Sequence, residues 1–119
     1  MITEVLDRLQ NSTGLPIHAL HSNVTGNNKV YPCLVYTYYL QDDNGARARW
    51  RLELNLITET VEEAEIYRQE INDIITTGDG AGEYEHITSL KLNGGGQMFN
   101  YETMTLHTYM YYDVYERSL

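Results

Sequence analysis

The segment from Ala46 to Thr77 constrains the fold most, because its hydrophobic period changes in the middle. Apolar and charged residues alternate in its first half, as in a strand with one buried face and one charged face. In its second half the apolar residues recur at the spacing of one helical face, and Thr60 with Glu63 forms a capping-box signature at the change. The sequence therefore predicts a strand leading into an amphipathic helix. The core of this unit is predicted to include Trp50, Leu52, Leu54, Ile71 and Ile74.

The rest of the chain shows the same two periods in shorter segments. A chain of 119 residues forms one domain of ordinary size. The sequence predicts an α+β domain, with an antiparallel or mixed sheet, two helices packed on one face, and the order α-β-β-α-β-β. The further predicted segments are a helix at 2–12 stopped near Gly14, a short extended piece at 17–20, a loop at 22–29, a strand at 32–40, a hairpin turn at 41–45, a loop at 78–86 beginning with the helix stop Gly78, a strand at 87–93 and a flexible connection at 93–96.

The last predicted strand, residues 98–116, is too long for so small a domain. At about 3.3 Å per residue it would reach roughly 60 Å. Either the strand bends, bulges or projects towards a neighbouring subunit, or a loop or bulge splits it in two.

Charge and cysteine content narrow the classes of function. The net charge is −9, which argues against nonspecific binding to nucleic acid or to an anionic membrane. Apolar runs are too short to span a bilayer, and the N-terminal residues do not resemble a signal peptide. The single cysteine, Cys33, cannot form a disulfide within the chain, so a reducing compartment is expected.

The sequence shows no catalytic or metal-binding signature. Cys33 lies in an apolar segment without an activating base, and no serine has the flanking glycines of a nucleophile elbow. The glycine-rich run 78–82 follows a helix and precedes a strand, the reverse of a phosphate-binding loop. We therefore expect no enzyme activity, no cofactor and no metal. Partners at zinc-like spacing are missing for all four histidines, namely His18, His21, His86 and His107.

Two surface features are unusual for a monomer. Three of the eight basic residues share one face of one strand, and an apolar residue lies on the acidic face of the helix that follows. In so acidic a chain, the basic face could meet an acidic face on a second copy, or the arginines could pair within the subunit with Glu53 and neighbouring strands. Eleven tyrosines suit either subunit contacts or strands. The candidate interface residues are Arg47, Arg49, Arg51, Glu62, Glu65, Ile66 and Asp73.

The order of these segments resembles the small tail-terminator and tail-completion proteins of long-tailed bacteriophages. That family has an N-terminal helix, a Pro-hydrophobic-Val-Tyr strand, a charged alternating strand, an acidic helix, a glycine-containing loop and a closing β-hairpin. The loops at 78–86 and 93–96 are longer and richer in glycine than in the family's pattern. The matching segments are 6–16, 30–41, 49–75 and 104–116, which cover most of the chain in order.

The resemblance implies a structural role in the virion tail, with assembly in the cytoplasm of the bacterial host. Such proteins form homo-oligomeric rings, often hexamers, at the head-proximal end of the tail tube. Their partners are the tail-tube protein and the head connector or stopper protein, and no cofactor, membrane or specific nucleic acid is implied. The alternatives are another minor tail component, or a small cytosolic α+β enzyme or ligand-binding domain with its site near His86 or His107.

Overall fold

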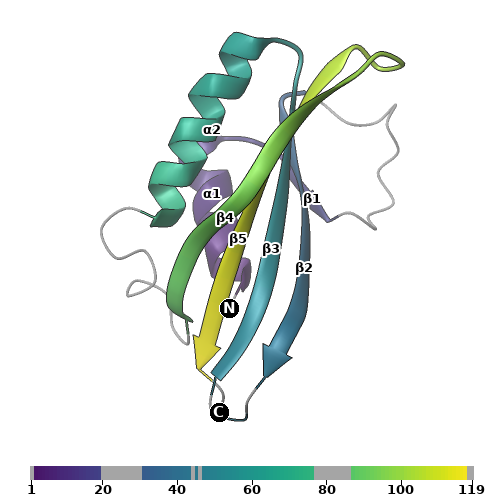
Figure 1. Ribbon diagram of the computed structural model, residues 1–119. Helices are drawn as coiled ribbons and strands as arrows, with labels where there is room; N and C mark the ends of the chain where they lie inside the picture. The colour runs from purple at the N-terminus through teal and green to yellow at the C-terminus, as the bar shows by residue number, and fades with distance from the viewer. Residues whose placement is uncertain (1, 20–30, 44, 46, 77–86, 118–119) are drawn as a thin grey trace.

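The computed structural model describes residues 2–19, 31–43, 45, 47–76 and 87–117. In this part of the chain two helices lie on one face of a five-stranded mixed sheet (Figure 1). The predicted α+β class is confirmed, but the predicted order lacked one strand, because β1 forms between α1 and β2. The elements are α1 (Ile2–Thr13), β1 (Ile17–Ala19), β2 (Cys33–Asp43), β3 (Arg47–Thr58), α2 (Val61–Thr76), β4 (Ile87–Asn100) and β5 (Thr105–Arg117).

The sheet has the strand order β1-β2-β3-β5-β4. β1 pairs in parallel with β2, and the other neighbouring strands are antiparallel. β3 and β5 pair from Arg47 opposite Arg117 to Thr58 opposite Leu106, so the predicted charged strand lies at the centre of the sheet. β4 is an edge strand in the described part of the chain.

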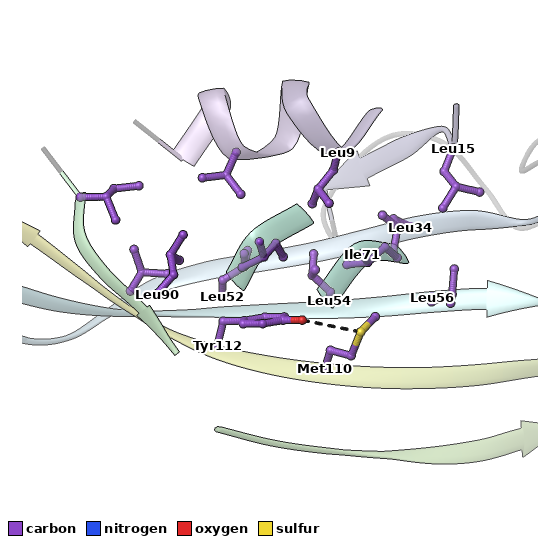
Figure 2. Close-up of a cluster of buried hydrophobic side chains, with 14 residues drawn as sticks. Leu9, Leu15, Leu34, Leu52, Leu54, Leu56, Ile71, Leu90, Met110 and Tyr112 are labelled. Carbon is purple, nitrogen blue, oxygen red and sulfur yellow. Dashed lines mark hydrogen bonds between the residues drawn. The ribbon is translucent and has the colours of Figure 1, made fainter. Parts of the chain in front are cut away.

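The main hydrophobic core lies between the sheet and the two helices (Figure 2). Leu52, Leu54 and Ile71 are fully buried, as the alternation of β3 and the period of α2 predict. Trp50 and Ile74 are only partly buried and pack against the edge of this core. Trp50 stacks on Tyr38 with ring centroids 4.8 Å apart. Further members of the core are Val5, Leu9, Leu15, Leu34, Leu56, Ile75, Ile87, Leu90, Met110, Tyr112 and Val114.

Hydrogen bonds confirm the predicted start of α2 and the predicted end of α1. The Glu63 N–H donates to Thr60 Oγ1 at 3.2 Å, and the Thr60 hydroxyl donates to Glu63 Oε1 at 3.3 Å. The first is the N-cap bond of a capping box, whereas the second joins the two side chains and is not the reciprocal bond from the Thr60 backbone N–H to the Glu63 carboxylate. Gly14 ends α1 with φ +73° and donates to the Gln10 carbonyl at 2.8 Å. Local signals therefore set both helix boundaries.

Two predicted segments differ in the structure. β2 runs on to Asp43 through a bulge between Leu40 and Asp42, so the turn is shorter than the predicted 41–45. Gly45 has φ +90°, and its N–H donates to Asp43 Oδ1 at 2.9 Å. The loops predicted at 22–29 and 78–86, with Gly78, lie outside the described residues. No helix in the described ranges is long and apolar enough to cross a membrane.

The glycine run is part of a strand rather than a flexible connection. Residues 93–96 lie inside β4, where the register with β5 shifts between Leu92 and Gly95. A Cβ at Gly95 would collide with the Tyr109 carbonyl oxygen, so glycine permits a close approach of the two strands. The chain turns instead at residues 101–104, which split the long predicted strand between β4 and β5.

Tyr112 places a polar group in the core and makes stability depend on pH. Its hydroxyl donates to Asn72 Oδ1 at 3.0 Å and lies 3.9 Å from Met110 Sδ (Figure 2). Burial raises the pKa of Tyr112 well above its usual value of 10.0. The folded state therefore keeps a proton that the unfolded state releases above about pH 10, and the free energy of unfolding falls as the pH rises past that value.

The Tyr112→Phe variant is expected to be less sensitive to alkaline pH. Without the buried hydroxyl, the free energy of unfolding no longer falls by up to about 1.4 kcal/mol per pH unit above pH 10. Loss of the hydrogen bond lowers the free energy of unfolding by about 0.5–1.5 kcal/mol at neutral pH. Urea unfolding across that pH range measures both effects, with Tyr101→Phe as the control because Tyr101 is 80% exposed. Identical pH slopes for wild type and Tyr112→Phe would contradict the assignment.

Candidate interaction surfaces

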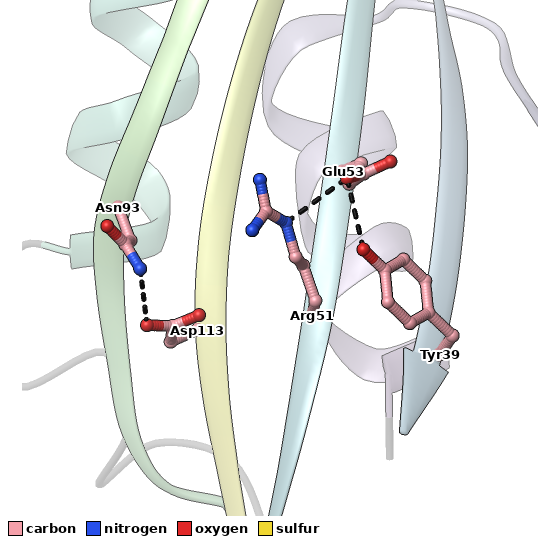
Figure 3. A network of polar contacts seen from close by, with 5 residues as sticks. All are labelled: Tyr39, Arg51, Glu53, Asn93 and Asp113. Carbon is pink, nitrogen blue, oxygen red and sulfur yellow. Dashed lines mark hydrogen bonds and ion pairs between the residues drawn. The ribbon is translucent and has the colours of Figure 1, made fainter. Parts of the chain in front are cut away.

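The sheet face opposite the helices carries the three predicted arginines and several tyrosines. Odd-numbered residues of β3 and β5 point to this face, because directly paired residues share a side and the even-numbered ones pack in the core. Figure 3 shows part of it, with the helices behind the sheet. We call this the open sheet face, and its residues on β3 and β5 are Arg47, Arg49, Arg51, Glu53, Asn55, His107, Tyr109, Tyr111, Asp113 and Tyr115. Near one end, Cys33, Val35 and Ile57 form a small buried cluster with Tyr31.

The three predicted arginines lie together on the open sheet face. The Arg47 guanidinium carbon is 4.4 Å from the Tyr115 ring centroid, and that of Arg51 is 4.5 Å from the Tyr111 ring centroid. Such cation–π contacts hold the basic groups against the sheet surface. The tyrosines were not among the predicted site residues, since only the pairing of β3 with β5 brings them beside the arginines.

The arginines differ in how they are engaged within the subunit. Arg51 Nε lies 3.1 Å from Glu53 Oε2, and the Tyr39 hydroxyl donates to the same oxygen at 3.2 Å (Figure 3). Arg51 therefore pairs with Glu53 within the subunit, which is one of the two alternatives that the sequence left open. Arg47 and Arg49 are exposed and border a hollow of about 270 Å³ with Asp42 and Tyr115.

The predicted acidic residues lie on the outer face of α2. Glu62, Ile66 and Asp73 are exposed, and their spacing of four and then seven residues puts them on one side of the helix. Ile66 is 65% exposed, as its position away from the apolar stripe predicts. Glu65 lies beside this row and is 3.1 Å from Arg68 Nη2. The acidic face of α2 thus lies on the other side of the domain from the arginines, and the two predicted surfaces do not meet within one molecule.

A third surface, the tip of the β4–β5 hairpin, was not predicted. It presents four apolar side chains, Met98, Phe99, Tyr101 and Met104, which all count among the exposed large residues. The Phe99 and Tyr101 rings meet edge to face at a centroid distance of 4.9 Å. The sequence shows no glycine or proline at this turn, and a split within residues 98–116 was only one of the two alternatives that it left open.

His107 and a small hollow lie on the open sheet face. His107 is tied into the sheet, with Nδ1 3.0 Å from Asn55 Nδ2 and Nε2 3.1 Å from Thr105 Oγ1. No group of three or more potential metal ligands occurs in the described ranges. A hollow of about 220 Å³ beside Asn55 and Tyr109 is smaller than the pockets of about 300–1,000 Å³ that hold small molecules. His21, His86 and the run 78–82 lie outside the described residues.

Comparison with known proteins assigns no family to the chain. No family model matches it, and no curated protein matches it either.

Proposed function

We propose that this protein is a structural component of a phage tail, which forms a ring on the head-proximal end of the tail tube and joins it to the head connector or stopper protein. The ring is proposed to contain six copies, as in the proteins that the sequence resembles. In this proposal the chain acts through its surfaces, assembles in the cytoplasm of the bacterial host and uses no cofactor.

The observation that carries the proposal is the placement of two surfaces of opposite charge. Arg47 and Arg49 lie on the open sheet face, whereas Glu62 and Asp73 lie on the outer face of α2. A contact between these different surfaces is heterologous, so every copy offers one surface to each neighbour and the chain of contacts can close by rotation. Opposite charges favour this pairing over contacts between like surfaces.

The lengths of the two surfaces are also compatible. From Arg47 to Arg51 the strand rises about 13 Å, and from Glu62 to Asp73 the helix rises about 16 Å. Ile66 and the tyrosines of the open sheet face add apolar and aromatic area to the same contact. Aromatic residues are enriched in protein interfaces, and exposed ion pairs alone contribute only about 0–1 kcal/mol each.

Tube assembly in the presence of the protein tests the proposed role. The tail-tube protein from the same genome is polymerised with and without this chain, and tube ends are imaged by electron microscopy. The expected result is a ring at one end only and shorter tubes at higher doses, because a capped end cannot grow. Rings that leave both tube ends bare would contradict the terminator role and would favour another minor tail component. A monomer with no effect on tubes would contradict the proposal as a whole.

A further inference from the structure

Asn55 on the open sheet face carries a buried oxygen, Oδ1, that accepts no hydrogen bond from the residues that the structure describes. The nitrogen of the same amide, Nδ2, lies 3.0 Å from His107 Nδ1. Buried polar atoms are paired in the great majority of cases, and an unpaired one costs free energy. The Asn55 side chain would therefore gain a hydrogen bond if Oδ1, instead of Nδ2, faced a donor.

The hydrogen bonds around His107 determine which ring nitrogen carries the proton of the neutral imidazole. Asn55 Nδ2 can only donate, so Nδ1 accepts and the proton lies on Nε2. Nε2–H then donates to Thr105 Oγ1 at 3.1 Å, and the Thr105 hydroxyl donates to Thr103 Oγ1 at 2.6 Å. The hydrogen bonds therefore run in one direction, from Asn55 through His107 to the turn at 101–104.

A second proton on the His107 ring does not fit this arrangement. An imidazolium donates from both of its nitrogens. Nε2–H keeps its acceptor, Thr105 Oγ1, but Nδ1–H would face the hydrogens of Asn55 Nδ2, donor against donor. Turning the amide of Asn55 over places Oδ1 where Nδ2 was, so that it accepts from Nδ1–H. This rotation gives the unpaired oxygen a partner and leaves the hydrogen bonds on the Thr105 side unchanged.

The direct neighbours of His107 on the adjoining strands are uncharged. Ile57 of β3 and Met98 of β4 lie opposite it in the register, and the Tyr109 ring stacks on its ring with centroids 6.3 Å apart. Glu53 lies further along β3, beyond Asn55, and is already paired with Arg51. The charged and titratable groups on β3, β4, β5 and the turn on or beside this face are Arg47, Arg49, Arg51, Glu53, Lys91, Glu102, Tyr109, Tyr111, Asp113 and Tyr115.

We propose that Asn55 and His107 form a proton-controlled switch on the open sheet face. With a neutral ring, Asn55 donates to His107 through Nδ2, and with a protonated ring Asn55 turns over and accepts through Oδ1. Histidine side chains ordinarily take up a proton near pH 6.5, so mild acid operates such a switch. Asn55 also lines the hollow of about 220 Å³ with Thr37 and Tyr109, and the rotation changes its buried group beside this hollow from an acceptor to a donor. The switch lies within one subunit and does not depend on the proposed ring.

Nitrogen-15 NMR of the wild-type protein tests both states of the switch. At about pH 8, well above the ordinary pKa of histidine, the His107 ring is expected to carry its proton on Nε2. During acidification the side-chain NH2 signals of Asn55 should shift with the same midpoint as the His107 ring. His18 on β1, which pairs with Val35 of β2, is the internal comparison, and its titration should leave the Asn55 signals unchanged. A ring with its proton on Nδ1 at pH 8, or Asn55 signals that do not follow His107, would overturn the proposal.

Two variants separate the switch from a purely structural hydrogen bond. Asn55→Asp places a carboxylate opposite Nδ1, which accepts without turning over, so the midpoint of the His107 titration should rise by about one pH unit or more. Asn11→Asp makes the same change at an exposed position on α1 and is the matched control. His107→Gln removes the titrating ring, and the response of the Asn55 signals to acid should disappear. An equal rise of the midpoint in both Asp variants, or an acid response of Asn55 that persists in His107→Gln, would overturn the switch.

Discussion

Leu54→Ala is expected to lower the free energy of unfolding by about 2–5 kcal/mol. Leu54 is fully buried at the centre of β3, where it pairs with Tyr36 on β2 and Met110 on β5. Truncation removes apolar contacts and leaves a cavity that neighbouring strands, held by their hydrogen bonds, cannot close. Chemical denaturation followed by circular dichroism measures the change.

Two comparisons make this result specific to the core. Ile71→Ala should cost a similar amount, because Ile71 is fully buried on the helix that covers the same core. Leu40→Ala removes the same atoms as Leu54→Ala from a side chain that is 47% exposed, and it should stay within about 0.5 kcal/mol. Losses below about 1 kcal/mol for both buried positions would contradict the assigned core.

Reversing the charge of Arg47 and Arg49 to Glu should abolish ring assembly at low salt. Exposed ion pairs contribute about 0–1 kcal/mol each, and reversal replaces attraction by repulsion, so two pairs change a contact by up to about 4 kcal/mol. That is roughly a thousandfold in the association constant. Sedimentation at low and high salt measures the effect, which should shrink as ions screen the charges.

A charge-swap variant provides the matched control. Adding Glu62→Arg and Asp73→Arg to the two arginine reversals restores the net charge of −9 and the complementarity between copies. Assembly should return in this quadruple variant if the open sheet face meets the acidic side of α2. Unchanged assembly in the arginine variant, with the fold intact by circular dichroism, would show that the ring does not use this face.

The fold could be predicted where local patterns determine it. The alternation of β3, the helical period of α2 and the N-cap at Thr60 are all confirmed, because each depends on residues close together in the chain. Alternation also predicts that Arg47, Arg49 and Arg51 share a face. These features needed no knowledge of the strand order.

The β4–β5 hairpin could not be predicted in the same way. The run Asn93–Gly96 has the composition of a turn but forms a bulge, because β5 approaches too closely for a side chain at Gly95. The actual turn at 101–104 contains no glycine or proline and uses Met104 at a positive φ instead. Both outcomes depend on the pairing of two long strands, which local composition does not reveal.

The candidate surfaces could also be predicted only where they depend on residues close together in the chain. The alternation of residues along β3 predicts that the arginines share one face. Their contacts with Tyr111 and Tyr115 arise from the register of β3 with β5. The apolar tip of the β4–β5 hairpin likewise emerges only from the three-dimensional arrangement.

The mass of the wild-type assembly shows whether the protein forms a closed ring. Native mass spectrometry at low salt, with electron microscopy of the same sample, gives both the number of copies and their symmetry. We expect a closed ring at six times the 13.8 kDa of one chain. A species of 13.8 kDa alone at every concentration, or open chains of indefinite length, would contradict it.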